Sequence, residues 1–407
     1  MSDGIRRREF VKASATVAAG LAFVKPGSLY GNDTIGLGII GSGGRGGYIG
    51  REFLGVGGTR IVALHDLFDD RLAETRERLD KVADEKGAPR IADGMLFKGP
   101  DAYRKLLAAP GVDAVIITSP PYFHPDHFEA AVAAGKHCWL EKPVATDVHG
   151  TKQVEATGRK GAGKVSMAVG FQGRYSEQYQ EMVRRIHDGA IGDLVTAQTY
   201  YYSGDLNRKG RDGASPLENR VRNWVFDKQL SGDILVEQNI HVLDIVNWVT
   251  RAHPVSALAT GGKKARLDVD CWDHYNVVYT YPGNVHVTFG STQFDKSYDS
   301  RAQRFMGTKG YAEAHFGKGG VRIVGDNPWD ANSEDAYGQA VPRKIAAFLE
   351  SIRTKNYQND VPSGAESTLT AILGRTAAYE GEERTWDKLV RGNDRWKQVV
   401  DLSALKA

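Results

Sequence analysis

Short apolar runs alternate with charged, amphipathic stretches along the first third of the chain. Runs 35–40, 61–64, 114–118 and 137–140 have the length and composition of buried strands. The stretches between them carry charges at helical spacing, and the clearest predicted helix spans 70–86. Strands that alternate with helices are typical of a parallel sheet with right-handed crossovers.

After about residue 146 the pattern shifts toward longer runs in which apolar and polar side chains alternate. Strands are predicted over 165–170, 194–202, 276–281, 285–289 and 310–316, and helices over 146–157, 176–188, 341–353 and 367–379. Pro282, Gly283 and Asn284 predict a hairpin turn between two of these strands. The pattern favours an α+β domain built on a largely antiparallel, open sheet.

A glycine-rich loop, Gly41-x-Gly43-x-x-Gly46, separates the first strand from the helix that follows it, and Asp66 ends the second strand. Such a loop aims backbone N–H groups at a pyrophosphate, with glycines that permit the turn, the approach of phosphate and close helix packing. Asp66 can accept both ribose hydroxyls of an adenosine and repels a 2′-phosphate. The motif therefore predicts NAD, while NADP stays open because nearby arginines could offset that charge.

At 407 residues the chain is long enough for two domains with separate cores. We predict an NAD(P)-binding α/β Rossmann domain, with a parallel, doubly wound sheet, over 34–160. Residues 161–407 are predicted to form an α+β domain for substrate binding and oligomerisation, whose C-terminal helices close against the first domain. Residues 1–33 are predicted to be a signal segment and linker.

Basic and acidic side chains nearly balance, with 53 Lys and Arg, 50 Asp and Glu, and a net charge of +3. Because no basic tract with interleaved aromatic residues follows the N-terminus, nucleic acid is not a predicted partner. The two cysteines, Cys138 and Cys271, could form one disulfide in an oxidising compartment.

The N-terminal segment resembles a secretion signal. Residues 7–12, Arg-Arg-Glu-Phe-Val-Lys, resemble the twin-arginine export motif, and a weakly apolar run follows over 13–24. That run is shorter than the roughly 20 residues of a bilayer span, so no permanent membrane span is predicted. We expect export of the folded protein by the twin-arginine machinery to the periplasm; a surface helix rich in arginine is the alternative.

Glu141, Lys142 and Pro143 directly follow the strand at 137–140. Ligands of such sheets lie beyond the carboxyl ends of the strands, so Lys142 is predicted to lie beside the nicotinamide. Pro143 biases Lys142 toward an extended backbone, which helps to fix its direction. The alternative is an ordinary ion pair in a surface loop.

Glu237 and His241 lie on an apolar helix that is predicted to run to Val249. Residues four apart share one helix face, and a carboxylate beside an imidazole raises its pKa and fixes its tautomer. We predict that His241 is the general base for an alcohol proton and that Glu237 orients it. A hydrogen-bonded core histidine is the alternative. No second histidine lies at i−4, so no metal is predicted.

Two further stretches are candidates for the substrate pocket. Arg174 and Tyr175 follow a predicted strand near the domain junction, and Arg222 and Trp224 precede the His241 helix. Polar groups beside an aromatic ring suit a sugar, whose C–H face stacks on the ring while its hydroxyls form hydrogen bonds. Structural salt bridges around a core tryptophan are the alternative.

Several stretches together resemble the glucose–fructose oxidoreductase and inositol dehydrogenase family, Gfo/Idh/MocA. They are 38–46, 118–124, 134–143, 237–244 and, in the tail, 366–379. The resemblance implies a Rossmann domain and an open-sheet domain with the substrate between them. It also implies a dimer or tetramer, and exported members often hold the cofactor tightly.

The resemblance carries site residues onto this chain. It implies Lys142 beside the reacting carbon and His241 as acid and base. The implied cofactor-binding residues are Gly41, Gly43, Gly44, Arg45, Gly46, Asp66, Ser119, Pro120, His124, Glu141 and Lys142. Where the family often has aspartate and glycine before the histidine, this chain has Glu237 and Asn239; Asn239 could contact substrate or fill space.

These features predict an NAD(P)-dependent oxidoreductase that acts on a CH–OH group of a sugar, polyol or glycoside. His241 removes the hydroxyl proton and Lys142 stabilises the developing charge on oxygen. A redox-neutral glycosidase or lyase, which oxidises a sugar carbon only transiently, is the alternative, because free NAD is scarce outside the cytoplasm. A non-catalytic binding protein is the third hypothesis.

Overall fold

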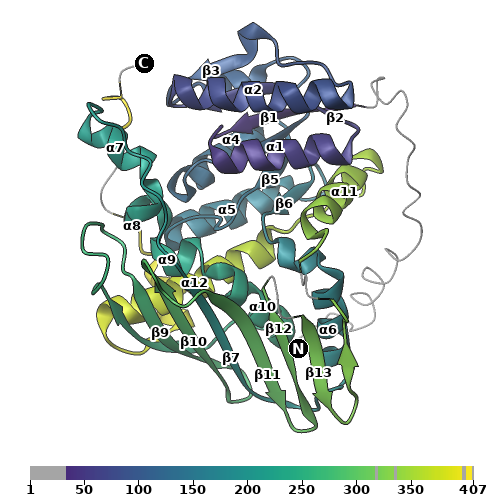
Figure 1. The fold of residues 1–407 in the computed structure, drawn as a ribbon, viewed down its shortest axis with the longest axis vertical. Coiled ribbons are helices and arrows are strands. Elements are labelled where there is room, and N and C mark those ends of the chain that lie inside the picture. Colours follow the sequence, from purple (N-terminus) through teal and green to yellow (C-terminus); the bar gives the residue numbers. More distant parts are fainter. Residues whose placement is uncertain (1–33, 317–319, 334–336, 397–399, 406–407) are drawn as a thin grey trace, which may run out of the picture.

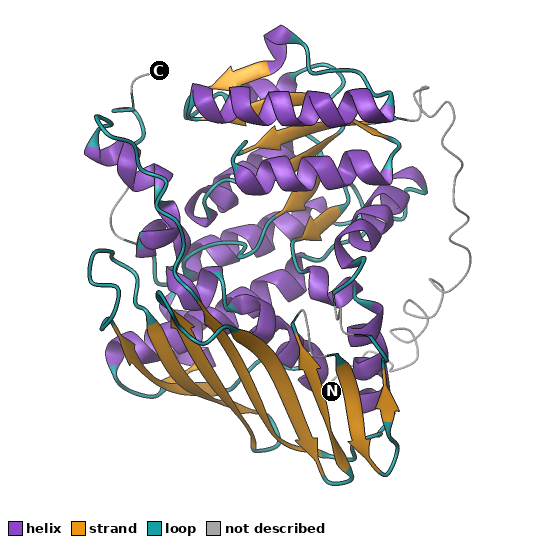
Figure 2. Ribbon diagram, in the orientation of Figure 1, coloured by secondary structure: helices purple, strands orange, loops and turns teal. Residues whose placement is uncertain are grey.

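Two sheets of different kinds organise the computed structural model (Figure 1). The structure describes residues 34–316, 320–333, 337–396 and 400–405, so the predicted signal segment lies outside the described residues. Figure 2 shows most helices on both faces of the upper sheet and between the two sheets. No helix in these described ranges has the length and apolar composition of a membrane span.

The first sheet has six parallel strands in the order β3-β2-β1-β4-β5-β6. The strands are β1 (Ile35–Ile40), β2 (Thr59–Asp66), β3 (Leu96–Lys98), β4 (Ala114–Ile117), β5 (His137–Leu140) and β6 (Met167–Val169). The helices are α1 (Gly44–Val56), α2 (Asp69–Lys86), α3 (Tyr103–Ala108), α4 (His124–Ala133) and α5 (Val148–Gly161). The predicted doubly wound Rossmann architecture is confirmed, and the sheet extends to β6, beyond residue 160.

The second sheet has nine strands in the order β14-β13-β12-β11-β7-β10-β9-β8-β15. They are β7 (Leu194–Ser203), β8 (Ser256–Gly262), β9 (His274–Tyr281), β10 (Val285–Gln293), β11 (Ser300–Gly307), β12 (Gly310–His315), β13 (Val321–Gly325), β14 (Trp329–Asp330) and β15 (Arg384–Thr385). All neighbours are antiparallel except β7 and β10, so the predicted largely antiparallel sheet is confirmed. The predicted turn at 282–284 joins β9 to β10.

The helices of the second half lie on the side of this sheet that is turned toward the first domain. They are α6 (Glu177–His187), α7 (Pro216–Arg222), α8 (Lys228–Ser231), α9 (Asp233–Glu237), α10 (Ile240–Thr250), α11 (Ala340–Arg353), α12 (Val361–Glu380) and α13 (Trp386–Gly392). Of these helices, α6, α10 and α12 pack directly on strands of the sheet. Among the described elements no helix covers the opposite face, which Figure 2 shows at the lower edge of the molecule.

Two C-terminal helices connect the halves. Helix α11 packs on α1, where Phe348 and Leu349 join the core around Phe53 and Trp139. Helix α12 lies against α5, and a Cβ at Gly158 would lie 2.6 Å from Val361. Gly158 therefore permits close helix packing and does not end α5, which runs to Gly161, four residues beyond the predicted end at 157.

Cys138 and Cys271 are both buried and free. The disulfide that the sequence left open does not form, and each cysteine acts as a small buried apolar residue.

Candidate active site

The glycine loop between β1 and α1 has the packing that a dinucleotide site requires. A Cβ at Gly41, where φ is +92°, would lie 2.5 Å from the backbone N of Ser119, and a Cβ at Gly46 would lie 2.3 Å from the Gly41 carbonyl oxygen. At Gly43 and Gly44 a Cβ would meet no atom within 4 Å. Two glycines thus allow close packing, while the other two border the open space into which phosphates would fit.

Asp66 ends β2 beside this loop, as predicted. Its Oδ1 accepts a hydrogen bond of 3.1 Å from the Phe68 N–H. Burial raises the pKa of the Asp66 carboxyl to about 6, and backbone hydrogen bonds oppose that shift. A half-buried carboxylate at this position has oxygen lone pairs available for ribose hydroxyls.

The loop after β4 is tied to the loop after β5 by His124. Its two ring nitrogens lie 2.8 Å from the carbonyl oxygens of Pro143 and Ser119, and burial lowers its pKa to about 4. The Ser119 hydroxyl lies 2.9 Å from Nδ1 of His127. Both ring nitrogens of His124 face backbone carbonyl oxygens, so this side chain holds the loop of Ser119 and Pro120 in place, and its contact with the cofactor stays a prediction.

Glu141 and Arg45 form an ion pair next to the glycine loop. Glu141 Oε1 accepts from Arg45 at 3.1 Å and from Trp139 Nε1 at 3.0 Å. Burial favours the protonated form of Glu141, but Arg45 and Trp139 together hold the pKa of Glu141 below its usual value. Arg45 Nε and Glu141 Oε2 are buried and have no partner among the described residues, so both can still bind a ligand here.

Lys142 reaches across to the second domain and binds Glu237. Its Nζ donates to Glu237 Oε1 at 2.9 Å and to the Glu237 carbonyl oxygen at 2.6 Å. The two side chains are 12% and 15% exposed, so this is not the solvated surface pair of the alternative interpretation.

The predicted single helix around Glu237 and His241 is wrong, because α9 ends at Glu237 and α10 begins at Ile240. The residues between the two helices, Gln238 and Asn239, are hydrogen-bonded to side chains of the nine-stranded sheet. Gln238 Oε1 accepts from Ser203 of β7 at 3.2 Å and from Gln293 of β10 at 3.0 Å.

Asn239 occupies the second position of this break and is fully buried. Its Oδ1 accepts from Ser291 of β10 at 2.6 Å, and its Nδ2 has no partner among the described residues. The bond to Ser291 holds the Asn239 amide in the core, and with Nδ2 unpartnered a contact of Asn239 with substrate stays a prediction.

His241 does not pair with Glu237, whose carboxylate binds Lys142 instead. Burial lowers the pKa of His241 well below its usual value, and the charges of Lys142 and Arg45 lower it further. The predicted upward shift is therefore wrong. The ring lies 6.2 Å from Phe171 and 6.1 Å from Phe316 between centroids, and no hydrogen bond to it is found within the described part of the chain. The geometry favours a neutral imidazole that can accept a proton.

Arg174 and Tyr175 are engaged elsewhere, which corrects their prediction as substrate residues. Arg174 binds the buried carboxylate of Asp244 through two nitrogens at 2.9–3.1 Å and lies over Trp248. The Tyr175 ring lies 4.7 Å from Nζ of Lys344 on α11. For this stretch the alternative, a structural salt bridge beside a tryptophan, is confirmed.

Arg222 and Trp224 are also wrongly predicted as substrate residues. Arg222 binds Asp70 at the start of α2, and Trp224 packs in an apolar cluster with Leu67 and Phe68, which follow β2. Both residues therefore lie at the adenosine end of the predicted cofactor site, away from Lys142.

Sequence reasoning missed Arg301, because strand β11 is not among the predicted strands. Arg301 is paired in register with Tyr201 of β7, and its guanidinium lies 4.9 Å from that ring. Burial raises the pKa of Tyr201; Arg301 opposes this shift and Glu237 adds to it. Arg301, Tyr201 and Phe316 therefore form a wall near Glu237 and His241.

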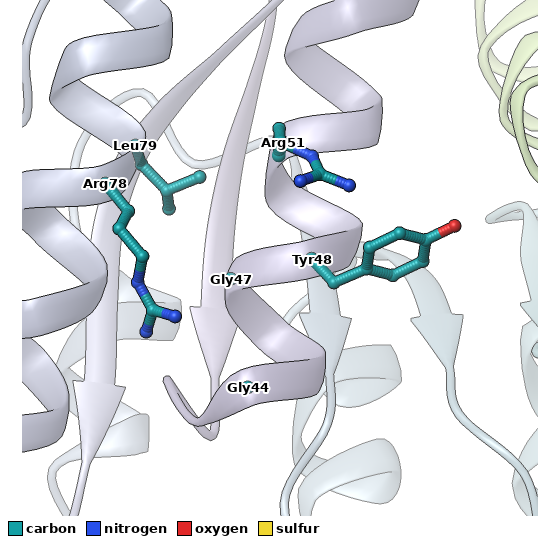
Figure 3. Close-up of a pocket in the computed structure, with 6 residues that line it drawn as sticks. All are labelled: Gly44, Gly47, Tyr48, Arg51, Arg78 and Leu79. Carbon is teal, nitrogen blue, oxygen red and sulfur yellow. The ribbon is translucent and has the colours of Figure 1, made fainter.

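A pocket of about 140 Å³ lies between α1 and α2. Figure 3 shows Arg78 on the α2 side and Arg51 and Tyr48 on α1. Neither Lys142 nor His241 lines it, but Gly44 of the glycine loop does, so the pocket adjoins the predicted pyrophosphate site. In the described parts of the chain no group of three or more His, Cys, Asp or Glu side chains is arranged to hold a metal ion.

Comparison with known families agrees with this geometry. Residues 35–169 match a profile described as "Oxidoreductase family, NAD-binding Rossmann fold", and residues 179–313 match the GFO/IDH/MocA C-terminal domain. The chain belongs to the Gfo/Idh/MocA oxidoreductase family. Its first domain is accordingly an NAD-binding domain of the Rossmann type.

Among curated relatives, a glycosyl hydrolase family 109 protein of Streptomyces coelicolor is 30% identical over 169 residues, 41% of this chain and 34% of the relative. A myo-inositol 2-dehydrogenase of Thermotoga maritima is 24% identical over 343 residues, 81% of this chain and 91% of the relative. The match to the first relative thus spans about a third of that protein, whereas the second match is nearly full-length.

The solved structures show the same fold. The aldose-aldose oxidoreductase from Caulobacter crescentus, complexed with glycerol, superposes with a TM-score of 0.69 at 21% identity and covers 86% of this chain and 99% of that one. At this identity the likeness concerns the architecture of both domains.

Proposed function

We propose that this family member is an NAD-dependent oxidoreductase that transfers a hydride between the nicotinamide and a CH–OH carbon of a sugar, polyol or glycoside. The observation that carries the proposal is the convergence of Lys142 from the end of β5 and His241 from the start of α10. The two groups are close enough for the charge of Lys142 to lower the pKa of His241. An ammonium donor beside a neutral imidazole is the pair that alcohol oxidation needs.

Different residues of the site would bind different parts of the cofactor. The glycine loop would hold the pyrophosphate and Asp66 the adenosine ribose, while Arg45 and Glu141 have polar atoms available near the loop. The bound NAD supplies or accepts the hydride. The carboxylate of Asp66 favours NAD over NADP, because a 2′-phosphate would meet a negative charge.

Lys142 and His241 would act on the substrate hydroxyl. The ammonium of Lys142 has three N–H donors, and two of them go to Glu237. The third can donate to the oxygen of the reacting alcohol and stabilise the charge that develops there. His241, kept neutral by burial, would accept the hydroxyl proton during oxidation and return it during reduction.

We place the carbohydrate against the wall formed by Arg301, Tyr201 and Phe316. Aromatic rings suit the C–H face of a sugar, and the Arg301 guanidinium, which pairs with Asp299 at 2.6 Å through one nitrogen, has further N–H donors for hydroxyl or carboxylate oxygens. Arg301→Ala should raise KM for the sugar and leave the dissociation constant for NADH unchanged.

The proposal is tested by isolating the protein, denaturing it and identifying the released nucleotide. The same preparation is then screened with a panel of sugars, polyols and glycosides by fluorescence of reduced nicotinamide. We expect NAD or NADH in the extract and reduction by at least one sugar or polyol. Absence of any nicotinamide nucleotide, together with no binding of added NADH, would refute the proposal.

The redox-neutral glycosidase alternative is not favoured. The glycosyl hydrolase family 109 relative is matched over about a third of its length, whereas the full-length match is to a dehydrogenase. The sugar panel separates the two activities by stoichiometry, since glycoside cleavage without net reduction of NAD would indicate the other chemistry.

We also propose that the uncovered face of the nine-stranded sheet pairs with a second copy of the chain. Leu258 and Val278 face each other there across β8 and β9 and are 56% and 40% exposed. Such an exposed apolar stripe on a broad sheet is typical of a protein interface. In light-scattering chromatography we expect a dimer or tetramer, which Val278→Lys shifts toward monomer; Leu267→Lys, on an exposed loop leucine, is the control.

We further propose export by the twin-arginine route to the periplasm, on the basis of Arg7 and Arg8 and the apolar run that follows. A substitution of both arginines by lysine should keep the protein in the cytoplasm. Fractionation of cells that express the two forms measures this, and equal periplasmic amounts would contradict the proposal.

A further inference from the structure

A bidentate ion pair connects the second domain to the start of α2 in the first domain. Arg222 of α7 donates to the two carboxylate oxygens of Asp70 at 2.9 and 3.0 Å, and Arg211 adds a contact of 2.7 Å. The Arg222 side chain is 3% exposed, and its guanidinium lies 3.9 Å from the ring centre of Phe68. Both arginines come from residues more than 140 positions later in the chain.

An apolar cluster lies beneath this ion pair and joins two loops of the first domain. Its buried members are Val221, Leu230 and Val400, and packed against them are Leu67, Phe68, Tyr122, Phe123, Leu217, Trp224, Leu402 and Leu405. Leu67 and Phe68 follow Asp66 at the end of β2, whereas Tyr122 and Phe123 follow the loop after β4. The second domain therefore contacts the loops after β2 and after β4 at the same time.

The strand order shows where these two contacts lie relative to the glycine loop. Strand β1 lies between β2 and β4, so a segment that contacts the loops of both neighbours passes over the end of β1. The glycine loop and the expected pyrophosphate site are at that end. In Figure 1, α7 and α8 rise from the second domain along the side of the first.

We propose that Arg222 is a positioning residue that retains the cofactor. Its ion pair with Asp70 holds α7 over the adenosine half of the NAD site. NAD can then leave or enter only when this ion pair opens. Opening would break both hydrogen bonds of the nearly buried Arg222 guanidinium to Asp70 and leave it only Glu218 of its own helix, which slows opening. The inference rests on the proposed NAD site and concerns the rate at which NAD leaves it.

The test is the release rate of NADH, measured by the loss of bound-NADH fluorescence after a chase with excess NAD. Asp70→Asn and Arg222→Gln should each accelerate release by about tenfold or more. Asp69→Asn is the matched control, because Asp69 is the adjacent acidic residue of the same helix turn but pairs with Lys98 inside the first domain. We expect NADH release from this control at the wild-type rate.

The double variant Asp70→Asn/Arg222→Gln should release NADH no faster than Asp70→Asn alone, since both changes break one contact. A general loss of folding would instead lower the unfolding temperature of the nucleotide-free variants, so that temperature is measured in parallel. Wild-type release rates in both single variants, or equal acceleration in Asp69→Asn, would overturn the inference. If Arg222→Gln fails to fold, Asp70→Asn decides alone. Wild-type protein that binds no NADH would overturn the proposed function itself.

Discussion

The two ends of the predicted cofactor site use charge in different ways. At the adenosine end, the carboxylate of Asp70 accepts three hydrogen bonds from Arg222 and Arg211 of the second domain. At the reacting end, Lys142 keeps one N–H donor after binding Glu237, and the His241 ring has no hydrogen-bond partner among the described residues.

This difference suggests that the Asp70 contact holds the two domains together, whereas Lys142 and His241 are the groups that we propose to act on substrate. A largely buried, bidentate ion pair resists separation, because opening breaks both of its hydrogen bonds at once. A donor and a neutral base with unused capacity can instead form bonds that strengthen as charge develops on a substrate. Four substitutions test this division, and they are given in order of expected effect.

Lys142→Met should have the largest effect. It removes the ammonium that we propose to stabilise the developing charge on the substrate oxygen, so kcat should fall by about 10³-fold, while the dissociation constant for NADH changes little. Steady-state rates with the best sugar of the panel and fluorescence titration with NADH measure both. Turnover close to wild type would contradict the assignment of Lys142.

His241→Asn should lower kcat by about 10²-fold, because the base for the hydroxyl proton is lost. The pH profile sharpens this prediction. Burial and the charge of Lys142 lower the pKa of His241, so the imidazole stays neutral to a lower pH than an ordinary histidine. For the wild type, kcat/KM for oxidation should therefore be flat through pH 6.5 and fall only below it; an acid limb above pH 6.5 would show that the predicted upward shift was right after all.

Glu237→Gln should lower kcat by about tenfold, since it weakens a charge-assisted hydrogen bond to Lys142 while the backbone carbonyl of residue 237 still accepts. The acid limb of the pH profile should stay where it is, because Glu237 does not contact His241. A large shift of that limb would indicate that Glu237 orients His241 in the working enzyme.

Asp66→Asn should have the smallest effect on turnover. It should weaken NADH binding by about tenfold and leave kcat at saturating NAD unchanged. The pKa of Asp66 is raised to about 6, so the wild-type carboxylate is charged above that pH and loses acceptor strength below it. NADH affinity of the wild type should therefore fall below about pH 6, and in the variant this dependence should disappear.

Elements with strong local signals were predictable. Strands at 35–40 and 137–140 have the predicted bounds, because each is a short apolar run that ends at a glycine loop or a charged residue. The glycine loop and Asp66 were equally accessible, since their spacing within one β-α-β unit places them at the same edge of the sheet.

Residues whose partners are distant in sequence were misplaced. Arg222 was expected near the sugar, but its partner Asp70 lies 152 residues earlier. Arg174 likewise binds Asp244, 70 residues later. Helical spacing placed Glu237 and His241 on one face, yet side chains of β7 and β10 hold the break between their helices. Periodicity along the chain contains no information about these contacts.

By itself the sequence determined the parallel sheet, the dinucleotide loop and the two side chains that we propose to react, because these follow from local periodicity and from motifs within short segments. Only the tertiary structure decided which charges neutralise each other, that Glu237 binds Lys142, and that Arg222 of α7 binds Asp70. The physical reason is that an ion pair or a shifted pKa depends on distance and burial, which arise when segments far apart in the chain pack together.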